Sequence, residues 1–201
     1  MIRTVVFDLG TVLAPGTDIY TAPAALLGVT PEVIEAHYWE GRRAYDDGGS
    51  AETYWHALLE RVGAEVTPGV AARLERQDAE AWMPLRPEAR ELVADCQEQG
   101  RHIVVLSNAP MAMVDTIAHA EWRGLVDDVY VSAELGFSKP DPRIYATVQE
   151  NLLCPPAQVA FIDDRLPNVE GALAFGWQAH LWISDADSRA WLNSLGIPLV
   201  G

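Results

Sequence analysis

The stretch VVFDLGTVL, residues 5–13, ends an apolar run in one carboxylate, Asp8, and places Gly10 two positions later. A short run rich in β-branched and apolar residues is typical of a strand buried on both faces of a sheet. Asp8 is therefore expected at the carboxyl end of a strand, the edge where open α/β sheets bind their ligands. An acid at that place is often only a turn former, so its meaning depends on the ends of the other strands.

Runs of the same kind recur along the chain, at 103–107, 128–132, 159–163 and 179–183. Helical patterns lie between most of them, and two of these patterns have Pro87 and Pro142 near their starts, where proline is favoured. Strands that alternate with helices predict an α/β fold, in which helices cover both faces of a parallel sheet.

The segment from 16 to 83 breaks this alternation. It contains no strand run, and Thr30, Ser50 and Thr67 each read as an N-cap that opens a helix. A helical insertion after the first strand is expected to sit over the carboxyl edge of the sheet, with MPLRP at 83–87 as the hinge of its return.

Composition and charge exclude several classes of protein. The 201 residues are 49% hydrophobic and carry a formal charge of −15, which would repel the backbone of a nucleic acid. No apolar run is long enough to span a membrane, and MIRTVVFDLG at the start reads as a first strand and not as a signal peptide. Cys96 and Cys154 belong to no metal-binding or redox pattern. The sequence therefore predicts a cytoplasmic protein that binds neither nucleic acid nor a membrane.

Polar groups able to do chemistry follow several of these runs, namely Asp8, Ser107 with Asn108, Lys139 in the loop GFSKPDP, and the pair Asp163 and Asp164. Each residue alone is explained as a cap, a turn former or a solvated charge. Those separate explanations do not account for the convergence of all of them on one edge of the sheet. Adjacent acids that leave a strand also repel each other unless a cation stands nearby.

Four stretches, in this order, resemble the motifs of the haloacid dehalogenase-like hydrolase superfamily: VVFDLGTVL, VVLSNA, GFSKPDPRIY and VAFIDDRLPNVEGALAFGW. The resemblance covers nearly the whole chain. It implies a Rossmann-like catalytic core formed by residues 1–15 and 84–201, and a mobile α-helical cap domain at 16–83.

The resemblance implies that Asp8 is the nucleophile, which attacks phosphorus and forms an aspartyl phosphate that water then hydrolyses. Ser107 and the backbone N–H of Asn108 would hold the phosphoryl oxygens. Lys139 would neutralise both the nucleophile and the phosphate, which otherwise repel each other. The implied activity is the hydrolysis of small phosphomonoesters.

The implied cofactor is Mg²⁺, held by the carboxylates of Asp8 and Asp164 and by the backbone carbonyl of Gly10. Asp163 would orient a metal-bound water or Lys139. Mg²⁺ prefers octahedral oxygen sites with few carboxylates, several waters and a substrate phosphate, so an acidic pair at a strand end suits it.

Gly10 departs from the pattern of the phosphatases of this family, in which a second aspartate protonates the leaving oxygen and later activates water. General acid–base help is typically worth ~10²–10⁴-fold in rate. One interpretation is a phosphatase that uses a good leaving group, such as an anomeric phosphate, or borrows an acid such as Thr11, Asp46 or Asp47. A second is a 2-haloacid dehalogenase, in which the same aspartate attacks carbon. A third is a catalytically weak protein that binds a phosphorylated metabolite.

Substrate choice is expected to lie in the cap, which closes over the site and excludes water. Arg42 and Arg43 could pair with a remote anionic group, and Tyr45 could stack on a sugar or base. With Thr11, they make up the predicted substrate-binding set. Surface ion pairs and packing within the cap explain these arginines and aromatic residues equally well.

Overall fold

The apolar runs form a parallel sheet in the part of the chain that the computed structural model describes, residues 1–199. Its strands are β1 (Thr4–Phe7), β2 (His102–Ser107), β3 (Asp128–Val131), β4 (Val159–Asp163) and β5 (Gln178–Leu181). Their order across the sheet is β3-β2-β1-β4-β5. The predicted α/β fold with a Rossmann-like parallel sheet is thereby confirmed.

β1 lies in the middle of the sheet, and this position builds the site. Phe7 of β1 pairs with Val105 of β2 on one side and with Ile162 of β4 on the other. Because the strands are parallel, the residues that follow all three emerge together at one edge of the sheet.

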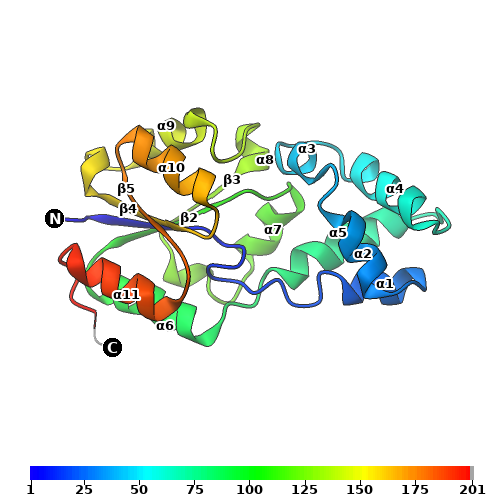
Figure 1. Cartoon of the computed structure of the whole chain (residues 1–201), viewed down its shortest axis with the longest axis horizontal. Helices are drawn as coiled ribbons and strands as arrows, with labels where there is room; N and C mark the ends of the chain where they lie inside the picture. The colour runs from blue at the N-terminus through cyan, green and yellow to red at the C-terminus, as the bar shows by residue number, and fades with distance from the viewer. Residues whose placement is uncertain (200–201) are drawn as a thin grey trace.

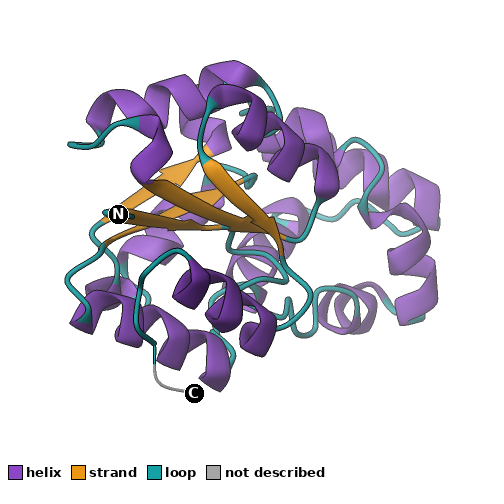
Figure 2. Cartoon of the chain, turned by 60° about the vertical axis from the view of Figure 1, so that its left-hand side comes forward, coloured by secondary structure: helices purple, strands orange, loops and turns teal. Residues whose placement is uncertain are grey.

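Helices cover both faces of the sheet (Figure 2). One face is covered by α6 (Pro87–Glu98), α7 (Ala112–Ala118) and α11 (Asp185–Ser194), the other by α9 (Pro142–Asn151) and α10 (Leu166–Phe175). Short elements complete the core, namely η1 (Arg123–Leu125), α8 (Ser132–Leu135) and η2 (Pro156–Gln158). Alternate residues of β1 serve the two faces, since Val5 and Phe7 pack in the first cluster and Val6 in the second.

The expectation that every strand is buried on both faces is wrong for the two edge strands. Gln178 of β5 is exposed, and the side chains of Asp128, Val129 and Tyr130 in β3 are only half-buried. An edge strand has a neighbour on one side only, and an apolar run in the sequence does not reveal which strands will lie at the edges.

The segment between β1 and α6 forms a second, all-helical lobe, the cap, drawn at the right of Figure 1. Its helices are α1 (Thr21–Leu27), α2 (Pro31–Tyr38), α3 (Arg42–Asp46), α4 (Ala51–Val62) and α5 (Val70–Ala81). They enclose a hydrophobic cluster of their own, in which Ile34, Trp55 and Leu58 are fully buried.

Two of the three predicted N-caps of the cap helices are confirmed. Thr30 precedes α2, and Ser50 precedes α4 and accepts a hydrogen bond from the N–H of Thr53 at 3.4 Å. The third prediction is wrong. Thr67 begins a turn in which its carbonyl accepts a hydrogen bond from the N–H of Val70, and α5 begins only after Gly69, which has a φ of 78°. A left-handed residue is most easily supplied by glycine, which lacks a Cβ.

The two connections between the lobes run side by side. The N–H of Arg86 donates to the carbonyl of Leu13 at 2.9 Å, and its guanidinium also bonds the carbonyl of Val12 and the carboxylate of Asp185. On the return path the Trp122 indole donates to the carbonyl of Met83 at 2.7 Å.

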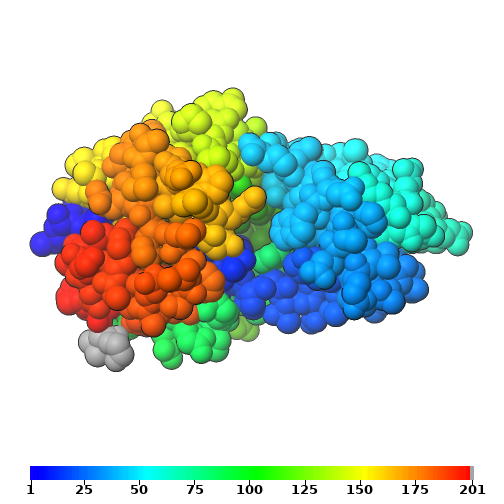
Figure 3. All heavy atoms as spheres, viewed as in Figure 1, coloured from blue at the N-terminus to red at the C-terminus, as the bar shows by residue number. Residues whose placement is uncertain are grey.

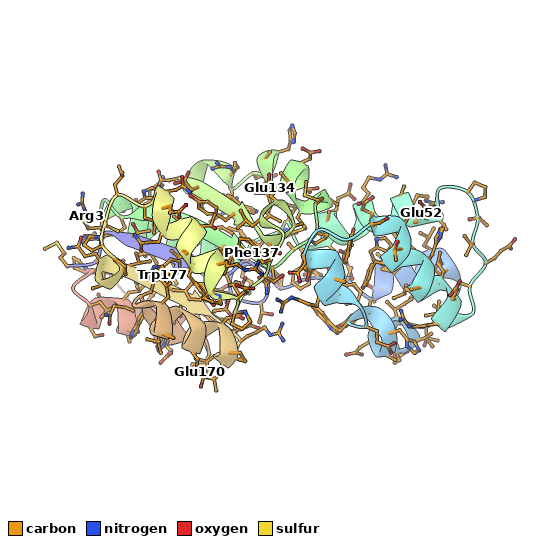
Figure 4. The ribbon with its side chains drawn as sticks, turned by 90° about the horizontal axis from the view of Figure 1, so that it is seen from above. Arg3, Glu52, Glu134, Phe137, Glu170 and Trp177 are labelled. Carbon is orange, nitrogen blue, oxygen red and sulfur yellow. The ribbon has the colours of Figure 1, made fainter. Side chains whose placement is uncertain are left out.

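The carboxyl ends of the strands face the cap. In Figure 4, Arg3, just before β1, lies at the end of the core away from the cap, and Glu52 lies on the cap. The division into 1–15, 16–83 and 84–201 is kept as a proposal, and residues 200 and 201 of that core range lie outside the described residues. Within residues 1–199, no helix is long and apolar enough to cross a membrane.

Candidate active site

The buried side chain of Lys139 joins the ends of the three central strands. Its ammonium group donates to the Asp8 carboxylate at 2.7 Å, to the Asp163 carboxylate at 2.7 Å and to the carbonyl of Leu106 at 2.6 Å. Burial lowers the pKa of Lys139, but the charges of Asp163 and Asp8 outweigh it, and the net pKa is raised. Lys139 is therefore a fixed positive charge beneath Asp8.

Asp163 is fully buried and holds this lysine in place. One of its oxygens accepts from Lys139, and the other accepts from the N–H of Arg165 at 2.8 Å and from the Asn168 amide at 2.9 Å. Of the two roles expected for Asp163, orienting Lys139 is the one that these hydrogen bonds support. Asn168 was missed by the sequence reasoning; its signal is the position five residues after Asp163, where the first turn of α10 brings it back to the strand end.

Asn108 fixes the loop that carries Lys139. Its side-chain amide donates to the Lys139 carbonyl at 3.0 Å, and its side-chain oxygen accepts from the Lys139 N–H at 2.8 Å. Among residues 1–199, neither the Ser107 hydroxyl nor the Asn108 backbone N–H has a hydrogen-bond partner. Both donors line the same cavity as Asp8, so they are available to an anion bound there.

A cluster of carboxylates stands at the strand ends. Within the described part of the chain, Asp8, Asp163 and Asp164 each offer an oxygen, and these oxygens lie within 4.8 Å of one another. Burial raises the pKa of Asp8 to about 7, although the positive charge of Lys139 lowers it. Burial and the negative charge of Asp163 raise the pKa of Asp164. Asp163 is already saturated with hydrogen bonds, which leaves Asp8 and Asp164 to hold a cation.

This donor set fits Mg²⁺. The available groups are carboxylate and carbonyl oxygens, the ligands that this ion prefers, and they carry more negative charge than Lys139 neutralises. Gly10 supplies a carbonyl that accepts one hydrogen bond, from the N–H of Val12 at 2.6 Å, and keeps a second lone pair. The turn is closed by Thr11, with φ 63°, whose N–H donates to the carbonyl of Ala14 at 2.8 Å.

A cavity of about 570 Å³ lies over these groups, between the core and the cap. The narrowing between the two lobes is visible in Figure 3. The core supplies Asp8, Gly10, Thr11, Ser107, Asn108, Lys139 and Asp164, among others, and the cap supplies Trp39, Arg42, Arg43, Asp46 and Trp82. The expected site residues of the core are thus brought together, with Asp163 directly behind them.

The cap residues of the predicted substrate-binding set take different positions. The Arg42 guanidinium is buried and bonds Asp46 at 2.8 Å and Asp78 at 3.0 Å, so its charge is balanced inside the cap. Arg43 also borders the cavity and is half-exposed, with Asp47 at 2.8 Å. Tyr45 lies in the cap core, where its ring stacks on another tyrosine at 4.7 Å.

Comparisons with known proteins agree with this geometry. The sequence model of the haloacid dehalogenase-like hydrolase family matches residues 2–176. The chain is 30% identical, over 100% of its length and 98% of the relative's, to a protein named phosphatase MT3486 from Mycobacterium tuberculosis (strain CDC 1551 / Oshkosh). It is also 30% identical, over 87% of its length and 86% of the relative's, to the sesquiterpene phosphatase astK from Aspergillus oryzae (strain ATCC 42149 / RIB 40).

Among solved structures, the L-2-haloacid dehalogenase from Xanthobacter autotrophicus has a TM-score of 0.70 and 23% identity, covering 96% of this chain and 83% of that one. That identity is low enough that the likeness concerns the fold alone. The match to the family extends from the first strand to the end of α10 and includes the strand ends that carry Asp8, Lys139 and Asp163. The chain belongs to the haloacid dehalogenase-like hydrolases, and the relatives that it matches over most of its length are named as phosphatases.

Proposed function

We propose that this protein is a Mg²⁺-dependent hydrolase of small phosphomonoesters, which works through an aspartyl phosphate on Asp8. The observation that carries the proposal is the buried ammonium of Lys139, 2.7 Å from the Asp8 carboxylate at the floor of the cavity. The family membership and the relatives named as phosphatases support it.

In the first step an Asp8 oxygen attacks phosphorus, and the bond between phosphorus and the ester oxygen breaks with its electron pair on the leaving oxygen. Lys139 offsets the repulsion between the carboxylate and the phosphate. The Ser107 hydroxyl and the Asn108 N–H donate to the phosphoryl oxygens as charge develops on them. In the second step water attacks phosphorus, and the bond between phosphorus and the Asp8 oxygen breaks with its electron pair on that oxygen. The water gives up its proton to solvent, and inorganic phosphate and the Asp8 carboxylate are released.

Asp8, Asp164 and the carbonyl of Gly10 would hold Mg²⁺. When bound, the ion supplies positive charge that draws the phosphate to an acidic site and stabilises the charge of the transition state. Asp47 pairs with Arg43 at 2.8 Å. Asp46 borders the cavity and pairs with Arg42 at 2.8 Å, and burial raises its pKa to about 6 despite that pairing, so Asp46 stays a candidate for the borrowed acid.

The substrate class in this proposal is a small phosphorylated molecule, and Arg43 is the cap cation placed to meet a second anionic group. Thr11 borders the same cavity and is kept as a substrate contact. We also propose a cytoplasmic location, supported by Cys96 and Cys154, which are free and buried.

The test is phosphate release from sugar phosphates, nucleotides and p-nitrophenyl phosphate, with and without Mg²⁺, beside an Asp8→Asn variant. Turnover that needs Mg²⁺ and disappears in the variant supports the proposal. Chloride release from a 2-chloroacid without phosphate release would make the protein a dehalogenase. Binding of inorganic phosphate without any turnover would indicate a metabolite-binding protein.

A further inference from the structure

Trp82 follows α5 directly and packs against the hydrophobic clusters of both the cap and the core. Its ring lies against two glycines of the loop that leaves β1. A Cβ on Gly10 would stand 3.4 Å from Cζ3 and 3.8 Å from Cη2 of the ring. A Cβ on Gly16 would stand only 2.6 Å from the same two atoms, and Gly16 has a φ of +62°. The ring therefore borders one side of the space into which a side chain at position 10 would extend.

The orientation of the ring decides which chemistry it presents. The indole nitrogen points to the Tyr38 hydroxyl in the cap, 3.4 Å away. That hydroxyl accepts from Arg42 at 2.5 Å and donates to Asp78, so the polar edge of Trp82 is tied into a buried network. The edge that faces Gly10 consists of the carbon atoms Cε3, Cζ3 and Cη2. A carbon edge has no exchangeable proton to give to a leaving oxygen.

We propose that Trp82 determines substrate specificity by closing the leaving-group side of the site, beside position 10, where the phosphatases of this family usually carry an acid. This inference rests on the proposed phosphatase function. Trp82 selects phosphomonoesters whose alcohol leaves without a proton donor and whose carbon skeleton offers an apolar or flat face to the ring. Phenyl phosphates and anomeric sugar phosphates combine both properties, whereas simple alkyl phosphates have poor leaving groups.

The rest of the cavity wall suits the same substrate class. Met113, Ala109 and Pro140 line it from the core, and Trp39 lines it from the cap. These side chains offer carbon atoms to the leaving group. The carboxylates and Lys139 gather at the strand ends beneath, and Arg42, Arg43 and Asp46 add charged groups from the cap. The cavity thus combines a charged floor for the phosphate with apolar side chains on part of its wall.

An acid at position 10 and the ring of Trp82 are expected to exclude each other. An alanine at position 10 just fits, since its Cβ would be in van der Waals contact with the ring. The carboxyl group of an aspartate extends one bond beyond Cβ, and the rotamers that point toward Trp82 would bring it against the ring. A Gly10→Asp substitution alone is therefore expected to displace the cap and not to restore acid catalysis.

The first readout is stability, and it does not depend on activity. Gly10→Asp is made in the wild type and in a Trp82→Ala background, and urea unfolding of the full chain is followed without metal. We expect Gly10→Asp to lower the denaturation midpoint strongly in the wild type and much less in the Trp82→Ala background. Trp82→Leu serves as a second background in case the alanine variant does not fold. Trp39→Ala is the matched control, a background in which Gly10→Asp should still lower the midpoint strongly. Equal falls in all backgrounds would overturn the proposal.

The second readout is kcat/KM with Mg²⁺ for a series of aryl and alkyl phosphates of rising leaving-group pKa. In the wild type and in Gly10→Asp, we expect kcat/KM to fall steeply as the leaving-group pKa rises. In the Gly10→Asp, Trp82→Ala double variant, it should fall less steeply. The alkyl phosphates should gain at least about tenfold there, a lower bound for restored general acid catalysis. A flat profile in Gly10→Asp alone would overturn the proposal. Absence of turnover in every variant would refute the phosphatase function itself, and with it the selection, while the stability coupling would still decide whether the ring excludes a side chain at position 10.

Discussion

Replacing Lys139 by methionine is expected to lower the free energy of unfolding, because it removes the positive charge that two buried carboxylates share. The substitution keeps the aliphatic stem and removes an ammonium that contacts Asp8, Asp163 and the carbonyl of Leu106 at 2.6–2.7 Å. Both carboxylates stay buried, with 8% and 0% of their surface exposed, and lose their shared counter-charge. Breaking a buried pair in this way typically costs ~3–5 kcal/mol of the free energy of unfolding.

The loss in free energy of unfolding caused by Lys139→Met should depend on pH. Burial already raises the pKa of Asp8 to about 7, and removal of Lys139, whose charge lowers that pKa, raises it further. A carboxyl whose pKa is higher in the folded state binds its proton more tightly there, so its stabilising contribution is present at low pH and is lost as pH rises through the folded pKa. The loss in free energy of unfolding caused by Lys139→Met is therefore largest above pH 7 and smaller at about pH 5. The difference between the two is ~1.4 kcal/mol per unit by which the substitution raises the pKa of Asp8.

The assay is urea unfolding in a chelator at about pH 5 and about pH 8. Arg43→Met is the matched control, because it removes the same charge from a half-exposed side chain near the cavity and should cost under ~1 kcal/mol. A loss in the free energy of unfolding for Lys139→Met as small as that of the control, or the same loss at both pH values, would contradict the role of Lys139 as the counter-charge of Asp8 and Asp163.

Three further predictions follow from the same contacts. Ser107→Ala should leave the urea midpoint nearly unchanged but lower kcat by ~10²-fold, because the hydroxyl has no partner among residues 1–199 and faces the cavity; a destabilised but active variant would give Ser107 a structural role instead. Asn168→Ala should lower the free energy of unfolding by ~1–3 kcal/mol, since the Asp163 carboxylate loses its bonds at 2.9 and 3.1 Å, and an unchanged midpoint would argue against that role. Mg²⁺ should raise the melting temperature more above pH 7 than at about pH 5, because the pKa values of Asp8 and Asp164 are raised and the ion binds their deprotonated forms. Equal stabilisation by Mg²⁺ at both pH values would count against that metal site.

The core of the site could be predicted because a strand end is a local feature of the sequence. Asp8 and Asp163 each end an apolar run, and parallel pairing alone brings such ends to one edge. The resemblance of the motifs added that Lys139 stands near Asp8 and that Asp163 orients Lys139 or a metal-bound water. That their strands are neighbours, with Lys139 contacting both carboxylates, is seen only in the structure. Apolar composition did not distinguish central strands from edge strands, which is why the burial of β3 and β5 was overestimated.

The cap residues were harder to assign. Arg42 and Arg43 are adjacent, and successive residues on a helix point about 100° apart, so one faces the cap core and the other faces solvent. Nothing local in the sequence says which, because the answer depends on Asp78 of α5, far along the chain. Trp82 escaped notice for the same reason, since its contact with Gly10 forms only when the chain returns from the cap.

Mass spectrometry of the intact protein shows whether Asp8 is the nucleophile. The protein is mixed with Mg²⁺ and excess phenyl phosphate, quenched in acid within the first turnover, and digested to locate the modification. We expect one added phosphoryl group on Asp8, and none in the Asp8→Asn variant. A phosphoryl group on another residue, or metal-dependent turnover that persists in Asp8→Asn, would contradict it.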